Sequence, residues 1–263
     1  MWIDSHCHLD APEFDADRDA VWQKALAVGV RQALVPSISL VQCDAVAACC
    51  ARYSNATARL FPAWGIHPLY VAAAEETDLQ GIARRVEAER PVAVGEIGLD
   101  GFVAGADIAR QTFFFVEQLK LARAFDLPVV LHVRRAVDAV LGHLRRIRVQ
   151  GGIAHAFNGS VQQAEAFLSL GFKLGFGGAA TFPGSTRIRR LAAELPMEAI
   201  VLETDAPDIS PVWLQGKRNS PAELPAIGRV LAELRGMTPE DFAAKVRANT
   251  LTALPGLQEH RIS

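Results

Sequence analysis

Short apolar stretches alternate with helix-like stretches along nearly the whole chain, and this alternation constrains the fold more than any other feature. Strands are predicted where apolar residues gather between turn residues. The predicted strands are Trp2–His6, Val30–Pro36, Leu60–Ile66, Pro91–Glu96, Pro128–His132, Gly152–His155, Phe172–Phe176 and Ile200–Thr204. A strand followed by a helix about eight times in roughly 250 residues is the repeat of a (β/α)8 barrel, or TIM barrel.

Helical patterns fill the intervals between these strands, and two more follow the last strand. The predicted helices include Ala16–Ala27, Asp107–Phe125, Ala136–Ile147, Pro221–Leu234 and Pro239–Ala253. The apolar face of the second of these consists of Ile108, Phe115, Leu119 and Ala122. No strand separates the last two helices, so we expect the segment from about residue 221 to pack on the outside of the barrel.

An open, doubly wound sheet is the competing architecture. That fold usually places a glycine-rich phosphate-binding turn after its first strand, whereas here the first strand runs into His6-Cys7-His8. The 263 residues are 50% hydrophobic, and no linker or low-complexity segment divides them. We therefore predict an α/β protein with a single domain, a (β/α)8 TIM barrel over residues 1–263.

Charge balance and cysteine content narrow the classes of protein. Lysine and arginine number 27 against 29 aspartates and glutamates, for a net charge of -2, so any nucleic-acid contact must be local. We expect neither a signal peptide nor a membrane span, because no stretch approaches about 18 apolar residues. The four cysteines form no CxxC pair, which predicts buried thiols in a cytoplasmic protein.

Histidines and carboxylates stand at the carboxyl ends of the predicted strands, where barrel enzymes carry their active sites. They are His6 and His8 after the first strand, Glu96 at the fourth, His132 at the fifth, His155 at the sixth and Asp205 after the eighth. Taken singly, the histidines fit polar strand ends or core positions, Glu96 fits a salt bridge and Asp205 fits a turn cap.

Taken together, these four imidazoles and two carboxylates would be unstable in one pocket without a cation. The mixture suits Zn²⁺, Mn²⁺ or Mg²⁺ alike, and six ligands fit two metals that share a carboxylate. Side chains alternate along a strand, so Cys7 points away from the His6 and His8 face and is expected in the core. Asp4 shares that face, either as a polar barrel residue or as a partner that orients an imidazole.

Six segments resemble those of the TatD-like metal-dependent hydrolases, in order and in spacing. They are DSHCHLD, GIHP, GEIGLD, LPVVLHVRRA, HAFNG and ETDAP, and the match runs from residue 4 to about residue 250. The resemblance implies a TIM barrel of the amidohydrolase-like superfamily with a binuclear metal site. It implies that one metal is held by His6, His8 and Asp205, that the second is held by His132 and His155, and that Glu96 bridges them.

The family is associated with hydrolysis of DNA phosphodiesters, typically as a 3′→5′ exonuclease on single strands. The resemblance places four further residues near the pocket as substrate contacts: His67, Arg134, Arg218 and Asn219. It leaves Glu96 and Asp205 as the catalytic carboxylates, with Asp205 as the candidate general base. A guanidinium fork suits phosphate, although Arg134 equally fits a rim arginine at the start of a helix. We expect a monomer that binds a DNA end or a small phosphodiester, with no stable protein partner.

Departures from the family pattern bear on the substrate and leave the expected ligands intact. Gly101, Phe102 and Val103 stand where many relatives have two tyrosines and an arginine, and HAFNG replaces HSFSG. A small-molecule phosphoesterase or a lactonase of the same superfamily therefore stays an alternative. The amidase-like type with a bridging lysine is disfavoured, because the fourth strand contains none. A non-catalytic binding protein is disfavoured, because all six expected ligands are present.

Overall fold

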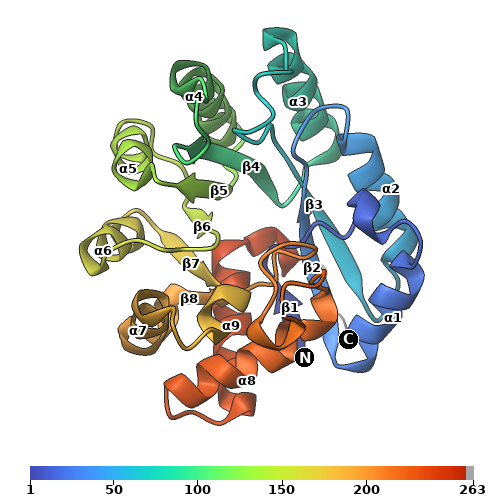
Figure 1. The fold of residues 1–263 in the computed structure, drawn as a ribbon. Coiled ribbons are helices and arrows are strands. Elements are labelled where there is room, and N and C mark those ends of the chain that lie inside the picture. The colour runs from blue at the N-terminus through green and yellow to red at the C-terminus, as the bar shows by residue number, and fades with distance from the viewer. Residues whose placement is uncertain (259–263) are drawn as a thin grey trace.

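The computed structural model, which describes residues 1–258, is a barrel of parallel strands surrounded by helices (Figure 1). The strands are β1 (Trp2–Asp4), β2 (Val30–Pro36), β3 (Arg59–Trp64), β4 (Ala93–Asp100), β5 (Val129–Arg134), β6 (Gly152–Ala154), β7 (Phe172–Phe176) and β8 (Ile200–Leu202). Each strand pairs in parallel with the next, in the order β1 to β8. The predicted (β/α)8 barrel is therefore confirmed.

The helices occupy the intervals that the sequence pattern indicated, with two at the end of the chain. They are α1 (Arg18–Ala27), α2 (Cys43–Tyr53), α3 (Glu76–Glu89), α4 (Ile108–Ala124), α5 (Val137–Arg146), α6 (Val161–Ser169), α7 (Thr186–Glu194), α8 (Leu224–Leu234) and α9 (Pro239–Ala253). Local chemistry fixes their starts. The Asp107 side chain accepts the Arg110 N–H before α4, and Thr238 accepts the Asp241 N–H before α9.

The last strand meets the first through a short seam that depends on one buried carboxylate. The Ser5 N–H donates to the Leu202 carbonyl at 3.1 Å. The Asp4 carboxylate accepts both the Thr204 N–H, at 2.9 Å, and the Thr204 hydroxyl, at 2.6 Å. Asp4 also accepts the backbone N–H of His6 at 3.3 Å. Of the two readings of Asp4, the structure therefore supports the polar barrel residue, because its hydrogen bonds go to this seam and to backbone rather than to an imidazole.

Two apolar layers hold the barrel together. The layer inside the strands includes Ile3, Leu34, Phe61, Val130, Ile153 and Val201. The end of α9 and the turn Pro255–Leu257 close this layer from below, with Ala253, Leu254 and Leu257 packed against it. We expected both final helices on the outside. For α9, Phe242 and Val246 pack between the helix and the strands, and its last residue, Ala253, reaches the inner layer.

The second layer lies between the strands and the surrounding helices. It contains Phe115, Leu119 and Ala122 of α4, as the helical spacing predicted, whereas Ile108 in the first turn of α4 is exposed. All four cysteines are buried and unpaired, and Cys7 belongs to this layer. Each large side chain that is fully buried here contributes about 1.5–3 kcal/mol relative to exposure.

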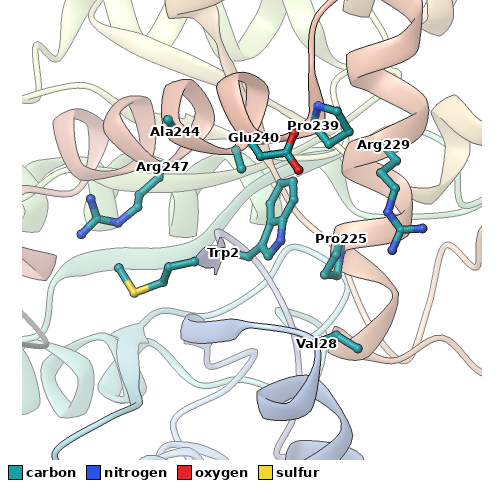
Figure 2. A pocket seen from close by; sticks show the side chains of 10 residues that line it. Trp2, Val28, Pro225, Arg229, Pro239, Glu240, Ala244 and Arg247 are labelled. Atoms are coloured by element: carbon teal, nitrogen blue, oxygen red, sulfur yellow. The ribbon is translucent and has the colours of Figure 1, made fainter.

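A cleft of about 700 Å³ opens at the amino-terminal end of β1, between the first residues of the chain and helices α8 and α9 (Figure 2). Trp2 lies at its centre, with Arg229 and Arg247 to either side. This cleft is at the opposite end of β1 from the predicted metal ligands, so it is separate from the candidate site. Within residues 1–258, none of the helices combines the length and hydropathy that a membrane span requires.

Gly152 at the start of β6 offers a test of how tightly the strands pack. Its φ is +139°, and a Cβ there would collide with the backbone of Val129 in β5. Gly152→Ala should lower the free energy of unfolding by at least about 2 kcal/mol, through backbone strain and a steric clash. Gly142→Ala in α5 is the matched control, because nothing lies within 4 Å of its added methyl group. The midpoint of thermal unfolding is measured for both variants. Equal shifts of the two midpoints from the wild-type value would contradict this account.

Candidate metal centre

Glu96 lies at the centre of the polar cluster at the carboxyl end of the barrel. Its side chain is 2% exposed. The register between β4 and β5 shifts between Val94 and Ile97, so a bulge sets the direction of the Glu96 side chain. The preceding residue must be glycine for β4 to approach β5, because a Cβ on Gly95 would lie 2.7 Å from the Cβ of Val130.

Five imidazoles face the two oxygens of this carboxylate. Glu96 Oε2 lies 3.2 Å from His6 Nε2 and 3.5 Å from His8 Nε2. Glu96 Oε1 lies 3.0 Å from His155 Nε2, 3.1 Å from His132 Nδ1 and 3.4 Å from His67 Nε2. The structure therefore brings together the expected ligand histidines from three strand ends, those of β1, β5 and β6, and adds His67 from the end of β3.

Asp205 completes the cluster on the side of His6 and His8. Its Oδ1 lies 3.4 Å from His6 Nε2 and 3.8 Å from His8 Nε2. Asp205 follows β8 in a left-handed backbone conformation, with φ at 57°. Buried Asn219 holds this loop, because its amide donates to the Thr204 carbonyl at 2.8 Å and to the Asp208 carbonyl at 2.9 Å. Asn219 thus positions the loop that carries Asp205.

Burial and mutual attraction shift the pKa values of the whole cluster. Burial disfavours the charged form of Glu96, but the surrounding histidines outweigh it and hold the Glu96 pKa well below its usual range. Burial lowers the pKa of His6 to about 3, and burial raises the pKa of Asp205 to about 6. Burial also opposes charge on His8, yet Glu96 and Asp205 raise its pKa to about 9. The carboxylates are therefore balanced here by protons on imidazoles, which a bound cation would replace.

The residues present fit a divalent metal. Three groups have ligand atoms within 4.8 Å of one another: His6 with His8 and Glu96, His6 with His155 and Asp205, and His67 with Glu96 and His132. Neutral imidazole nitrogens and carboxylate oxygens are ligands of Zn²⁺ and other divalent cations. The Nδ1 atoms of His6 and His155 are buried without a hydrogen-bond partner, so protein contacts alone leave this cluster incompletely satisfied.

Two acidic residues that sequence reasoning had not singled out lie near the outer nitrogens of these rings, Asp100 within hydrogen-bond distance and Glu203 beyond it. Asp100 Oδ2 lies 2.9 Å from His132 Nε2, which leaves His132 Nδ1 facing Glu96. Glu203 Oε1 lies 3.7 Å from His155 Nδ1. A carboxylate on the far nitrogen is the usual partner of a metal-binding imidazole. The signal was in the sequence, because GEIGLD and ETDAP each contain a second acid beside the expected ligand.

His67 differs from the other rings because its tautomer is fixed. The Leu69 backbone N–H donates to His67 Nδ1 at 3.1 Å. Burial lowers the pKa of His67, which favours the neutral ring. A neutral ring that accepts at Nδ1 carries its proton on Nε2, the atom that faces Glu96. In this geometry His67 donates from Nε2 toward Glu96, and its distances also allow ligation.

The two arginines expected near the pocket lie in different places. The Arg134 guanidinium lies over the ring of Phe102, 3.6 Å from its centroid. Arg218 makes an ion pair with Asp17 at 2.7 Å and donates to the Glu13 carbonyl at 2.5 Å. Arg218 therefore holds the loop after β8 against the start of α1. These contacts give no support to the expected substrate contact of Arg218.

A (β/α)8 barrel with clustered imidazoles and carboxylates at its carboxyl end has the architecture of a metal-dependent hydrolase. Residues 3–255 match the model of the family described as TatD related DNase. An uncharacterised metal-dependent hydrolase of Escherichia coli K12, YjjV, is 39% identical over 95% of this chain and 96% of its own. The crystal structure of YjjV superposes with a TM-score of 0.91, at 38% identity, over 97% of this chain and 98% of that one.

A second relative has a more specific name. The 3′-5′ ssDNA/RNA exonuclease TatD of Erwinia billingiae is 30% identical over 94% of this chain and 96% of its own. These matches bear out the resemblance seen in the sequence motifs. The chain belongs to the TatD family and is a metal-dependent hydrolase.

Asp100 should set the metal affinity through the tautomer of His132. In Asp100→Asn the new amide donates to His132 Nε2, which places the ring proton on Nδ1, the atom that faces Glu96. Metal affinity should fall about 10- to 100-fold, as measured by competition with a chromogenic chelator. Asp107→Asn is the matched control, because it makes the same change at the exposed start of α4. Equal affinities in the two variants would contradict a role for Asp100 in the site.

The metal content of two leucine variants should distinguish His67 from a ligand. His155→Leu should lose bound metal, because it removes an imidazole whose Nε2 faces Glu96. His67→Leu should retain the wild-type metal content after gel filtration, because its Nε2 carries a proton and offers no lone pair. Elemental analysis of both purified variants gives the comparison. Loss of metal from His67→Leu to the extent seen in His155→Leu would show that His67 is a ligand after all.

Proposed function

We propose that this chain is a phosphodiesterase that removes nucleotides from the 3′ end of single-stranded DNA, using two divalent cations. One observation carries the proposal. Glu96 Oε2 faces His6 and His8, whereas Glu96 Oε1 faces His132 and His155. A carboxylate that offers one oxygen to each of two imidazole pairs suits a bridge between two metals. Asp205, beside His6 and His8, would complete the first metal's set.

The ligand types narrow the identity of the cations to three candidates. Zn²⁺, Mn²⁺ and Mg²⁺ are the candidates, because histidine suits Zn²⁺ while carboxylate suits Mn²⁺ and Mg²⁺. When bound, such cations supply a water of lowered pKa and neutralise charge on the phosphoryl oxygens. The remaining chemistry falls to side chains of this chain.

Asp205 is our candidate for the group that accepts the proton of the attacking water. Its side chain is 13% exposed, against 2% for Glu96, so Asp205 is the more accessible of the two carboxylates. A general base must lie within hydrogen-bond reach of the proton that it takes. The Asn219 amide holds the loop that carries Asp205 and so keeps this carboxylate at the mouth.

His67 is our candidate for a hydrogen-bond donor to the phosphate. Its Nε2 proton faces the cluster, and the Leu69 N–H keeps the ring in that tautomer. A donor that is held in place before the substrate arrives stabilises developing negative charge more than mobile water does. We assign the phosphate contact to His67 and not to Arg218, because the Arg218 guanidinium is bound to Asp17.

The substrate class rests on a relative and on charge. The Erwinia billingiae relative is named as an exonuclease of single-stranded DNA and RNA. The net charge of -2 provides no general attraction to a long duplex, which favours short or terminal substrates held by the site itself. We propose that the chain acts as a monomer, and its four buried, unpaired thiols support a reducing compartment such as the cytoplasm.

A small-molecule phosphoesterase or lactonase is the second candidate. The residues after Asp100 favour it, because Gly101, Phe102 and Val103 differ from the tyrosines and arginine of many relatives. Pocket walls rather than ligands set specificity on a shared barrel. A comparison of oligonucleotides, small phosphodiesters and lactones with the metal-loaded wild type would separate the candidates. Faster hydrolysis of a lactone than of any phosphodiester would favour the second.

Loss of Glu96 should remove the activity. With Mn²⁺ or Mg²⁺ added back, Glu96→Ala should lower kcat on bis(p-nitrophenyl) phosphate and on single-stranded DNA by at least about 10³-fold, because it removes the shared ligand. Glu165→Ala, which removes an exposed carboxylate on α6, should retain wild-type kcat. Survival of hydrolysis near the wild-type rate in Glu96→Ala would show that the bridging role is wrong.

A further inference from the structure

An exposed aromatic ring and an arginine form a stacked pair beside the candidate metal centre. Phe102, in the connection between β4 and α4, is 45% exposed. The Arg134 guanidinium lies 3.6 Å from the centroid of its ring, and the Arg135 guanidinium lies 4.6 Å from it. Large apolar side chains that stay exposed next to a site are candidates for ligand contact.

One carboxylate fixes both this pair and the metal centre. Asp100 Oδ1 accepts the backbone N–H of Phe102 at 2.8 Å, while Asp100 Oδ2 lies 2.9 Å from His132 Nε2. Asp100 and Arg134 are also register partners across β4 and β5. The position of Phe102 is therefore coupled to that of His132 through a single buried side chain.

The two guanidiniums near Phe102 are free for a ligand. In the part of the chain that the structure describes, no hydrogen bond or ion pair holds the guanidinium of Arg134 or of Arg135, and both guanidiniums lie over the Phe102 ring. Arg134 lies two residues beyond His132 on β5, so the two side chains share a face of the strand. A guanidinium stacked on a ring keeps its N–H groups available for phosphate oxygens.

A second exposed ring lies on the other side of the same histidines. Tyr70 is 45% exposed, and its ring meets the His67 ring edge-on at 5.9 Å between centroids. The His67 and His132 rings are themselves 4.3 Å apart. The contacts thus run from Tyr70 through His67 and His132 to Asp100, which accepts the backbone N–H of Phe102.

We propose that Phe102 and Arg134 form a binding subsite for the terminal nucleotide, in which the base stacks on the Phe102 ring and the Arg134 guanidinium contacts a backbone phosphate. The inference rests on the proposed function and deepens it. Stacking accepts every base, because each has a π face. The base must also be unpaired to reach the ring, so this subsite selects single strands and frayed ends without reading sequence.

The experiment compares oligonucleotides that differ in one base. Two single-stranded substrates share the same backbone, and one carries a tetrahydrofuran abasic nucleotide at its 3′ end. Steady-state kinetics with Mn²⁺ would be measured for the wild type, Phe102→Ala and Phe102→Tyr. Phe113→Ala is the matched control, because Phe113 is similarly exposed but lies on α4 and not in the connection that Asp100 holds.

The wild type should show a KM about 10-fold lower for the base-bearing substrate than for the abasic one. Phe102→Ala should remove this preference, so that its KM values for the base-bearing and abasic substrates agree within about twofold, because only the base-bearing substrate can stack on the ring. Phe102→Tyr should retain the wild-type preference, since it keeps a stacking ring. Phe113→Ala should behave as the wild type.

Two results would overturn the proposal, and they are distinguishable. If the wild type cleaves both oligonucleotides and Phe102→Ala keeps the preference for the base, stacking on Phe102 is wrong while the nuclease function stands. If the metal-loaded wild type hydrolyses bis(p-nitrophenyl) phosphate but neither oligonucleotide, the nuclease function fails and the subsite fails with it. The unfolding midpoint of each variant shows whether a kinetic change reflects loss of fold.

Discussion

The buried Glu96 carboxylate is the constraint on which the rest of the structure depends. An isolated carboxylate that is 2% exposed would be costly, so it must be matched by positive charge or by a cation. Five imidazoles face it in the structure, and a bulge in β4 turns the carboxylate toward them. Those of His8, His132 and His155, whose pKa values are raised, supply the positive charge. The barrel is the scaffold that brings these rings together, because every strand ends at the same mouth.

The polar groups around the cluster orient its side chains and do not form a second set of metal ligands. Asp100 and Glu203 approach the outer nitrogens of His132 and His155, and the Leu69 backbone fixes His67. Asp4 accepts hydrogen bonds that hold the seam between β8 and β1, and the Asn219 amide donates to the loop after β8. Because each of these contacts fixes a backbone or a tautomer, the cluster is oriented before any ligand binds.

The side chains at the rim of the barrel mouth and those of the metal-binding cluster determine different properties of the enzyme. Ligands that hold metals support hydrolysis in general, whereas the side chains around the mouth choose the substrate. Phe102 stands where the sequence departs from the pattern of many relatives, Arg134 lies over its ring, and Asp100 links Phe102 to His132. The same buried carboxylate therefore connects the part of the site that is shared within the family with a part that distinguishes this chain.

The sequence by itself determined the barrel and the identity of the cluster. Alternating strand and helix patterns are local, and residues at strand ends converge in any (β/α)8 barrel, so His6, His8, Glu96, His132, His155 and Asp205 were predictable together. The tertiary structure decided the rest: the destination of Arg218 at Asp17, the bulge that aims Glu96, the tautomer of His67 and the closure of the barrel by α9. The His67 tautomer depends on the local backbone that aims the Leu69 N–H, and the other three depend on contacts between residues distant along the chain. Residue spacing within one segment encodes neither.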